Sequence, residues 1–105
     1  MVRGDVHTIR LQRGRGRVQH RRRFAVIVQA DDLLALSTIV VCPTSTSTPP
    51  ASFHPEVEIG DESARVMCEM VGAVDARMLG DQVAHLTLDE MQRIDEALEL
   101  VLDLA

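Results

Sequence analysis

Residues 20–29 read HRRRFAVIVQ, in which three consecutive arginines lead directly into five apolar residues. A short run of Phe, Val and Ile is typical of a strand buried within a sheet. We therefore expect a buried strand over residues 24–29, with cations at the entrance to the core. The chain as a whole has a formal net charge of -5, so this local excess of positive charge calls for an explanation.

Positive and negative charges are separated along the chain. Residues 1–23 hold eight arginines and one acid, Asp5, whereas the rest of the 16 acidic residues follow them. A basic segment of this kind attracts an anionic partner such as a phosphate backbone or an acidic peptide. The alternative is a solvated loop without a partner. All the cations are arginine, which suits bidentate phosphate contacts or else reflects codon bias.

Length and composition limit the organisation of the chain. Its 105 residues form a single domain, 1–105. The sequence has neither an apolar run of the ~20 residues that span a bilayer nor a secretory segment after Met1, which predicts a cytoplasmic protein with no membrane contact. Cys42 and Cys68 lack zinc-ligand spacing, so we expect buried apolar residues, or alternatively a facing pair or a disulfide. Neither a metal nor another cofactor is expected.

Short strands and loops alternate over most of the chain. A Gly-containing loop is expected over 12–22, and three prolines exclude regular pairing over 44–55. Asp31 is expected to cap a short helical turn, and a second turn is expected over 75–79. The strands are expected at 6–11, 24–29, 37–41 (ending by Pro43), 56–59, 65–71 and 83–86.

The C-terminal segment has the clearest pattern. Thr87 and Glu90 form a Thr-x-x-Glu capping box, which marks the beginning of a helix. Apolar residues recur behind it at helical spacing and predict an amphipathic helix packed on the strands. The fold class is therefore mainly β, a small barrel with a C-terminal α-helix. The apolar positions of the helix are Leu88, Met91, Ile94, Leu98 and Val101, and the acids of its outer, solvated face are Asp95, Glu96, Glu99 and Asp103.

In this order, the pieces of the chain resemble the MazF/PemK family of toxin endoribonucleases from bacterial toxin–antitoxin modules. The resemblance covers nearly the whole chain and implies an SH3-like, PemK/MazF-type barrel that forms a homodimer. It also implies sequence-specific, metal-independent cleavage of single-stranded RNA, leaving 2′,3′-cyclic phosphate and 5′-hydroxyl ends. The pieces are Arg3-Gly4-Asp5-Val6, the Gly-containing loop, Arg23 to Val28, Val41 to Ser45, and Leu86 to Leu98.

The resemblance places the catalytic pair at Arg23 and Thr44. When a ribose 2′-OH attacks the adjacent phosphorus, negative charge builds on the phosphate oxygens, which a guanidinium and a hydroxyl can stabilise. An arginine stays protonated in water, so it suits the role of clamp and acid better than that of base. His20 and His54 have a suitable pKa for the base, although the family does not depend on a histidine there; both are alternatively ordinary loop residues.

The loops 12–22 and 45–55 are expected to form the RNA groove. This chain lacks the Gly-x-Glu-Gln-Gly-Gly pattern that the family commonly has before an Arg-Pro, which affects the expected base preference more than the reaction. Phe24 is expected to be buried, so Phe53 is the better candidate for stacking on a base. The expected RNA-binding residues are Arg13, Arg15, Arg17, Gln19, His20, Arg21, Arg22, Ser45, Thr46, Phe53 and His54.

The resemblance also implies a partner, a MazE-like antitoxin with an acidic, disordered tail that competes with RNA for the basic segment.

Two other functions stay open. A CcdB-like toxin, which poisons DNA gyrase without cleaving anything, has the same fold but relies on a C-terminal Trp-Gly-Ile type ending, whereas this chain ends Leu102-Asp103-Leu104-Ala105. A non-catalytic SH3-like interaction module presents aromatic residues to proline-rich peptides, and this chain has two Phe, no Trp and no Tyr.

Overall fold

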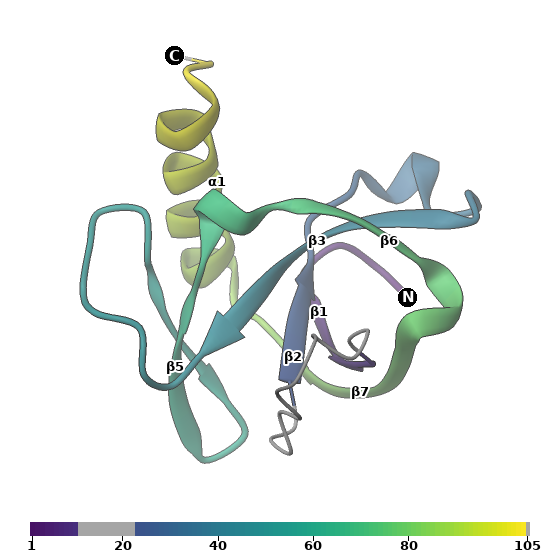
Figure 1. The fold of residues 1–105 in the computed structure, drawn as a ribbon, viewed down its shortest axis with the longest axis horizontal. Helices are drawn as coiled ribbons and strands as arrows, with labels where there is room; N and C mark the ends of the chain where they lie inside the picture. The colour runs from purple at the N-terminus through teal and green to yellow at the C-terminus, as the bar shows by residue number, and fades with distance from the viewer. Residues whose placement is uncertain (11–22, 105) are drawn as a thin grey trace, which may run out of the picture.

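The computed structural model describes residues 1–10 and 23–104. Within them, one antiparallel sheet curls around the core, and helix α1 packs against it (Figure 1). The strand order is β4-β5-β3-β2-β1-β7, and β6 pairs with another part of β3. The elements are β1 (Asp5–Ile9), β2 (Arg23–Ile27), η1 (Asp31–Leu33), β3 (Thr38–Ser45), β4 (Glu56–Ile59), β5 (Glu62–Val66), η2 (Cys68–Met70), β6 (Gly72–Asp75), η3 (Ala76–Met78), β7 (Leu79–His85) and α1 (Leu88–Leu102). No helix in these ranges is long and apolar enough to cross a membrane.

The apolar run after Arg23 forms β2, which is buried on both faces. Val26 belongs to the main core cluster, which includes the buried side of α1. Ala25 and Ile27 belong to a second cluster on the other face of the sheet. Because successive side chains of a strand point to opposite faces, a strand covered on both sides shows no polar alternation. The expected buried strand is confirmed, with bounds Arg23–Ile27.

Strand β3 pairs with three other strands. It pairs with β2 along one edge, while its other edge pairs first with β6 and then with β5. The expectation that this strand ends at Pro43 is wrong, because β3 continues to Ser45. The ladder with β6 ends at Val41 and the ladder with β5 begins at Thr44, so Pro43 lies between them. A missing N–H is tolerated at such a junction.

Two more strand predictions were wrong in their bounds. The strand expected over 65–71 ends at Val66, and the chain then turns through η2. The strand expected at 83–86 begins at Leu79, directly after the 3-10 turn η3, which confirms the short helical turn expected over 75–79. Strand β7 is an edge strand with mostly exposed side chains, so its hydrophobic pattern is weak.

The expected turn after Ala30 is present, but Asp31 does not cap it. Ala30 occupies the N-cap position of η1 and makes no side-chain cap hydrogen bond. Instead, the Asp31 carboxylate accepts a hydrogen bond from the backbone N–H of Arg3 at 2.6 Å. The Arg3 guanidinium in turn donates to the Val28 carbonyl and to Asp95 of α1. Arg3 therefore ties the segment before β1 to Val28, just after β2, and to α1.

Helix α1 begins with the expected capping box. The Glu90 N–H donates to Thr87 Oγ1 at 3.1 Å, and the Thr87 N–H donates to the Glu90 carboxylate at 2.9 Å. The second oxygen of Glu90 accepts from the Glu58 N–H, so the cap also joins the helix to β4. Leu88 was expected on the apolar face, but its side chain is 89% exposed. Met91, Ile94 and Ala97 form the buried stripe.

Replacing Thr87 with Ala should lower the free energy of unfolding by about 1 kcal/mol, because a helix N–H loses its acceptor. Urea denaturation followed by circular dichroism measures this loss. Thr87→Ser keeps the hydroxyl and should stay near the wild-type value. Equal losses in the two variants would show that the Thr87 methyl group, and not the cap, is responsible.

Candidate functional site

Arg23 and Thr44 lie on neighbouring strands at one end of the sheet. Arg23 begins β2 and pairs with Ile9 of β1. Strand β3 pairs with β2 through Ala25 and Pro43, and one further step of this register brings Thr44 opposite Phe24. A hydrogen bond from the Thr44 hydroxyl to the Phe24 carbonyl, at 3.2 Å, joins the two strands at that step. Thr44 therefore lies opposite Phe24, the residue that follows Arg23 in β2.

The two side chains differ in exposure. Thr44 is 5% exposed, whereas Arg23 is of intermediate burial. The Thr44 hydroxyl must rotate away from the Phe24 carbonyl before it can donate to a phosphate oxygen, although its lone pairs remain able to accept. Phe24 was expected to be buried, but it is only partly buried, packed against the main core cluster.

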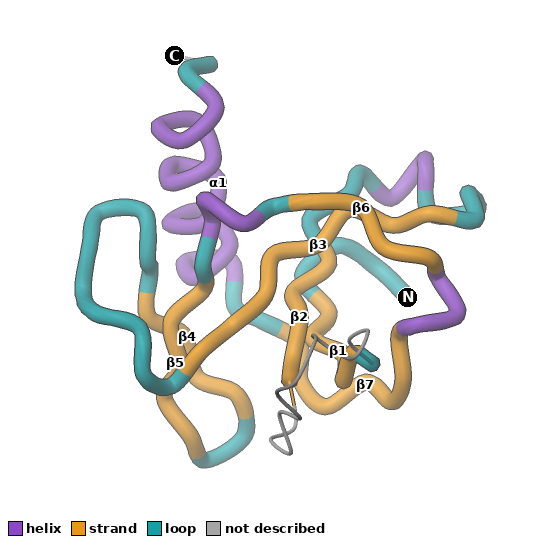
Figure 2. Tube along the Cα trace, viewed as in Figure 1, coloured by secondary structure: helices purple, strands orange, loops and turns teal. Residues whose placement is uncertain are grey.

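Beyond Thr44, hydroxyl groups gather at the start of the loop 46–55, which leaves β3 and returns into β4 (Figure 2). Ser45 still belongs to β3 and pairs with Arg65 of β5. Its Oγ lies 3.3 Å from Ser47 Oγ and accepts the Ser47 N–H. Thr46 is exposed. The expected contact residues Ser45 and Thr46 thus lie immediately after Thr44, on the same side of the molecule as the end of β3.

The other end of this loop carries Phe53 and His54. Their rings meet edge to face, with centroids 4.5 Å apart. His54 is 6% exposed, its Nδ1 lies 2.9 Å from the Pro49 carbonyl, and its Nε2 lies 2.7 Å from the Glu69 carboxylate. The hydrogen bond with Glu69 raises the pKa of His54 above its usual 6.5, although burial opposes the shift. Both nitrogens face acceptors, a geometry that does not suit a base taking a proton from a substrate.

The remaining sequence predictions for this site fall on the segment 11–22. They lie outside the described residues, so the sequence alone supports them. These residues are Arg13, Arg15, Arg17, Gln19, His20, Arg21 and Arg22. Arg23 joins that segment to β2, which places the basic stretch next to the candidate pair in the chain.

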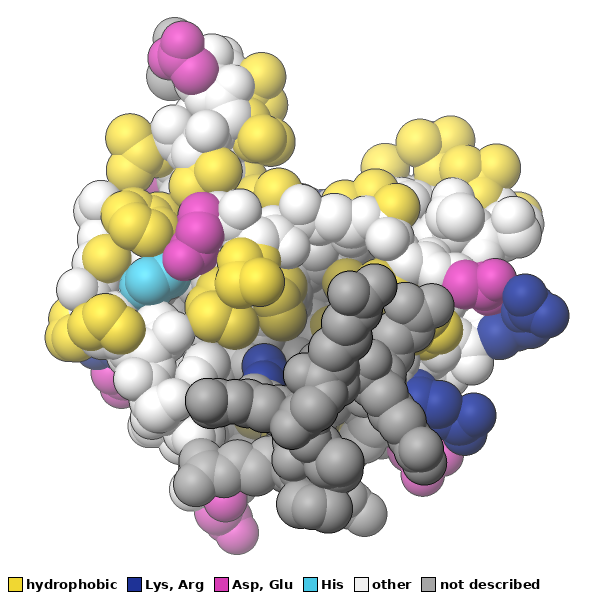
Figure 3. Space-filling model, in the orientation of Figure 1, with side chains coloured by type: hydrophobic (Ala, Val, Ile, Leu, Met, Phe, Trp, Pro, Cys, Tyr) yellow, Lys and Arg dark blue, Asp and Glu magenta, His cyan; other side chains and the backbone are white. Residues whose placement is uncertain are grey.

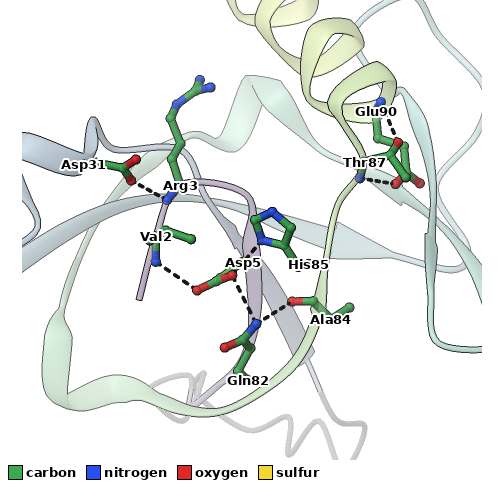
Figure 4. Close-up of polar contacts among 9 residues, drawn as sticks. All are labelled: Val2, Arg3, Asp5, Asp31, Gln82, Ala84, His85, Thr87 and Glu90. Atoms are coloured by element: carbon green, nitrogen blue, oxygen red, sulfur yellow. Dashed lines mark hydrogen bonds and ion pairs between the residues drawn. The ribbon is translucent and has the colours of Figure 1, made fainter.

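A polar cluster that sequence reasoning missed lies at the other end of β1 (Figure 4). Asp5 is 3% exposed and accepts hydrogen bonds from the Val2 N–H at 2.8 Å, from Gln82 at 3.1 Å and from His85 Nδ1 at 2.7 Å. Burial alone would raise the pKa of Asp5, but the hydrogen bonds from Val2 and His85 outweigh it and hold that pKa below its usual 3.8. Gln82 and His85 are far from Asp5 in sequence, so no local motif indicated the cluster.

This cluster lies away from the candidate pair. Asp5 pairs with His85 at the beginning of β1, whereas Arg23 pairs with Ile9 at its end. The four-residue step from Asp5 to Ile9 corresponds to ~13 Å along the strand. The cluster therefore fastens β1 to β7 without touching the candidate pair, which favours a structural role for it.

Replacing Asp5 with Asn should lower the free energy of unfolding at neutral pH by about 1 to 3 kcal/mol, because buried donors lose their acceptor. A carboxylate with a lowered folded pKa stabilises the fold above its unfolded pKa, and this contribution is lost as pH falls through the folded value. The difference from wild type should therefore shrink below pH 3.8. Urea titrations across pH measure it, with Asp61→Asn, in the exposed β4–β5 turn, as the control. A difference that does not change with pH would contradict this role for the charge.

Cys42 and Cys68 are both fully buried as free thiols. Cys42 lies in β3 two residues before Thr44, and Cys68 begins η2 two residues after Val66, the ladder partner of Thr44. Their contact, together with burial, raises the pKa of the Cys42 thiol. The expectation of buried cysteines is confirmed, and they form a facing pair without a disulfide.

Solved structures share this curled sheet and C-terminal helix. An endoribonuclease in complex with its cognate antitoxin, from Mycobacterial species, has a TM-score of 0.84 at 20% identity, covering 100% of this chain and 97% of that chain. A MazE–MazF complex from Deinococcus radiodurans has a TM-score of 0.84 at 16% identity, with the same coverage. The fold class is therefore that of the MazF-type small barrels, and the expected fold is confirmed.

Sequence comparison gives the family. The chain matches the PemK-like, MazF-like toxin of type II toxin–antitoxin systems over residues 2–102. A candidate toxin from Mycobacterium tuberculosis is 31% identical over 106 residues, which is 99% of this chain and 99% of that protein. The chain belongs to the PemK/MazF family of type II toxins.

Proposed function

We propose that this toxin is a metal-independent endoribonuclease that cuts single-stranded RNA and so inhibits translation and growth. The observation that carries the proposal is the position of Arg23 and Thr44 near the ends of two adjacent, paired strands, directly after the basic segment. The solved relatives of this fold include proteins named as endoribonucleases, which supports the same activity here. Because MazE–MazF complexes from bacteria share the fold, a cytoplasmic site of action is also part of the proposal.

In the proposed reaction, the ribose 2′-OH attacks the adjacent phosphorus and the 5′-oxygen leaves. The new P–O bond closes a 2′,3′-cyclic phosphate, and the leaving oxygen takes a proton to become a 5′-hydroxyl. Arg23 holds the nonbridging oxygens with its fixed fork of N–H donors. It also supplies the proton at the leaving oxygen and is reprotonated at once by the proton that the base has taken from the 2′-OH, so the guanidinium stays charged overall. Thr44 donates its hydroxyl to the charge that develops on phosphorus-bound oxygen. Of the two histidines considered as the base, His54 is occupied by Pro49 and Glu69, which favours His20 or water.

Replacing Arg23 with Ala or Thr44 with Val should reduce RNA cleavage by about a hundredfold or more, as for other single donors to a developing oxyanion. Cleavage of a long single-stranded RNA in EDTA measures the loss, and end analysis should show cyclic phosphate and 5′-hydroxyl groups for the wild type. The thermal melt of Arg23→Ala should stay close to wild type, and that of Thr44→Val should fall by only about 4 to 8 °C, which is what one lost hydrogen bond costs a domain of this size. Arg77→Ala, which removes an exposed arginine paired with Asp75, is the charge control.

Three outcomes would overturn parts of this proposal. Wild-type cleavage rates in Arg23→Ala or Thr44→Val would remove the assigned pair. Cleavage that needs a divalent ion would remove the metal-independent mechanism. A wild-type protein that cuts no RNA but inhibits gyrase would favour the CcdB-like alternative, and one that only binds peptides would favour the interaction module.

We propose two protein partners as well. An antitoxin with an acidic, disordered tail would be attracted by the arginines of residues 1–23, and the related complex with a cognate antitoxin supports this choice. A second copy of the chain would cover the leucines that the structure leaves exposed. Hydrophobic side chains gather along α1 and, at the upper right, over the η1 turn (Figure 3). The exposed leucines there include Leu33, Leu36, Leu88, Leu100, Leu102 and Leu104.

If RNA and antitoxin share the basic segment, reversing Arg17 and Arg21 to Glu should weaken both ligands. The loss should shrink with added salt, because the screening length is already roughly 8 Å in physiological buffer. Titration calorimetry with an antitoxin tail peptide and with RNA measures both affinities, and Arg77→Glu serves as the control. Unchanged affinity for the peptide at low salt, together with lost RNA binding, would show that the antitoxin binds elsewhere.

A further inference from the structure

His54 joins two parts of the molecule that are separate in sequence. Its ring lies between the Pro49 carbonyl, within the loop 46–55, and the Glu69 carboxylate of η2, at 2.9 and 2.7 Å. The imidazole side chain is 8% exposed, whereas the Glu69 side chain is 40% exposed. The ring therefore fastens the loop from inside, and Glu69 lies at the edge of the contact.

The two acceptors determine the protonation state of the ring. A neutral imidazole has one N–H, and neither a carbonyl nor an ionised carboxylate can donate in return. A neutral His54 therefore leaves one nitrogen lone pair against an oxygen lone pair, whereas an imidazolium donates to both. The raised pKa of His54 agrees with this geometry.

The other charges around His54 leave Glu69 as the dominant one. Arg65 of β5 donates through Nη1 to the His54 carbonyl at 2.9 Å, which opposes protonation of the ring. The same guanidinium donates through Nη2 to Glu56 of β4 at 3.2 Å, so its charge is partly balanced. Glu69, on η2, faces the imidazole directly.

The His54 contact holds a loop that begins and ends near the candidate pair. The loop follows Ser45, the neighbour of Thr44, and its far end is tied to β5 and η2 by backbone bonds from the Val66 N–H to Pro55 and from the Cys68 N–H to Phe53. The Phe53 ring, the candidate for base stacking, rests against the His54 ring. Releasing His54 would thus free the loop between two fixed ends and remove the support beneath Phe53.

We infer that His54, held in its protonated form between Pro49 and Glu69, is a positioning residue that fixes the loop 46–55 for binding single-stranded RNA. It acts through the loop and not on the reacting phosphate. RNA affinity should therefore fall as the imidazole loses its proton, while the rate of the bound complex stays nearly constant. This inference rests on the proposed RNA-cleaving function.

The decisive variant is Glu69→Gln. Its amide N–H can donate to Nε2 of a neutral imidazole, while Nδ1–H still donates to Pro49, so the contact no longer needs the extra proton. Affinity is measured by fluorescence anisotropy across pH on an RNA with every 2′-OH methylated, which cannot be cleaved. Wild-type affinity should fall about two- to tenfold as pH rises through the pKa of His54, which corresponds to one lost hydrogen bond. Glu69→Gln should show no such fall.

Two controls isolate the contact. Glu62→Gln makes the same charge change at the other end of β5 and should keep the wild-type pH dependence. Glu69→Ala leaves His54 without a partner and should bind weakly at every pH. With cleavable RNA, the change in wild type should appear in KM and not in kcat. If Glu69→Gln keeps the wild-type fall in affinity while wild type still cuts RNA, the inference is overturned and the proposed function stands.

A readout without RNA separates the two ideas further. Nitrogen-15 NMR of the imidazole follows protonation of His54 directly, and amide exchange of residues 51–54, corrected for its intrinsic pH dependence, follows the loop. Both ring nitrogens should be protonated below the pKa of His54, and amide protection in the loop should fall as pH rises through that pKa. A His54 pKa at or below 6.5 would overturn the inference whatever the RNA data show. A raised pKa in a protein that neither binds nor cuts RNA would instead overturn the proposed function, and with it the role of the loop in RNA binding.

Discussion

The change of partner along one edge of β3 is the constraint on which the rest of the structure depends. Along one edge, β3 pairs first with β6 and then with β5. Along its other edge, it pairs with β2. The two neighbours pair with successive parts of this edge, and the sheet curls between them (Figure 1). The bend lets β4 and β5 turn toward α1 and closes the main core. The pairing of β3 thus goes together with the curvature of the sheet and the closure of the main core.

The candidate residues lie on the strands next to this bend. Thr44 is the first residue of β3 that pairs with β5, and its hydroxyl reaches back to β2 next to Arg23. The loop 46–55 then crosses from β3 to β4, and the η2 turn that follows β5 supplies Glu69 to hold it. Arg23, Thr44 and Glu69 each lie near the end of a strand and not in its middle. Strand ends are where side chains can face a ligand while a paired backbone keeps them in place.

Local patterns carried much of the sequence prediction. The buried strand after Arg23 and the Thr87 capping box were recognised because their signals lie within a few residues of each other. Asp5 and His85 form a contact 80 residues apart, and His54 and Glu69 one 15 residues apart, so neither could be read from spacing. His54 was recognised as a loop histidine, but only the fold shows that its ring turns inward. Pro43 misled the strand assignment because a proline is tolerated where one ladder ends and the next begins.

Pro43 also separates the β6 ladder from the β5 ladder along β3. No backbone N–H is available there to continue the β6 ladder toward Thr44, and the Pro43 carbonyl bonds instead to the Met67 N–H on the β5 side. Opening of β6 from the edge of β3 can therefore stop at this residue, because no hydrogen bond links the next step to the last. The opening of an edge strand at β6 and η3 would then leave intact the pairing that holds Thr44 in place, because Pro43 separates the two ladders.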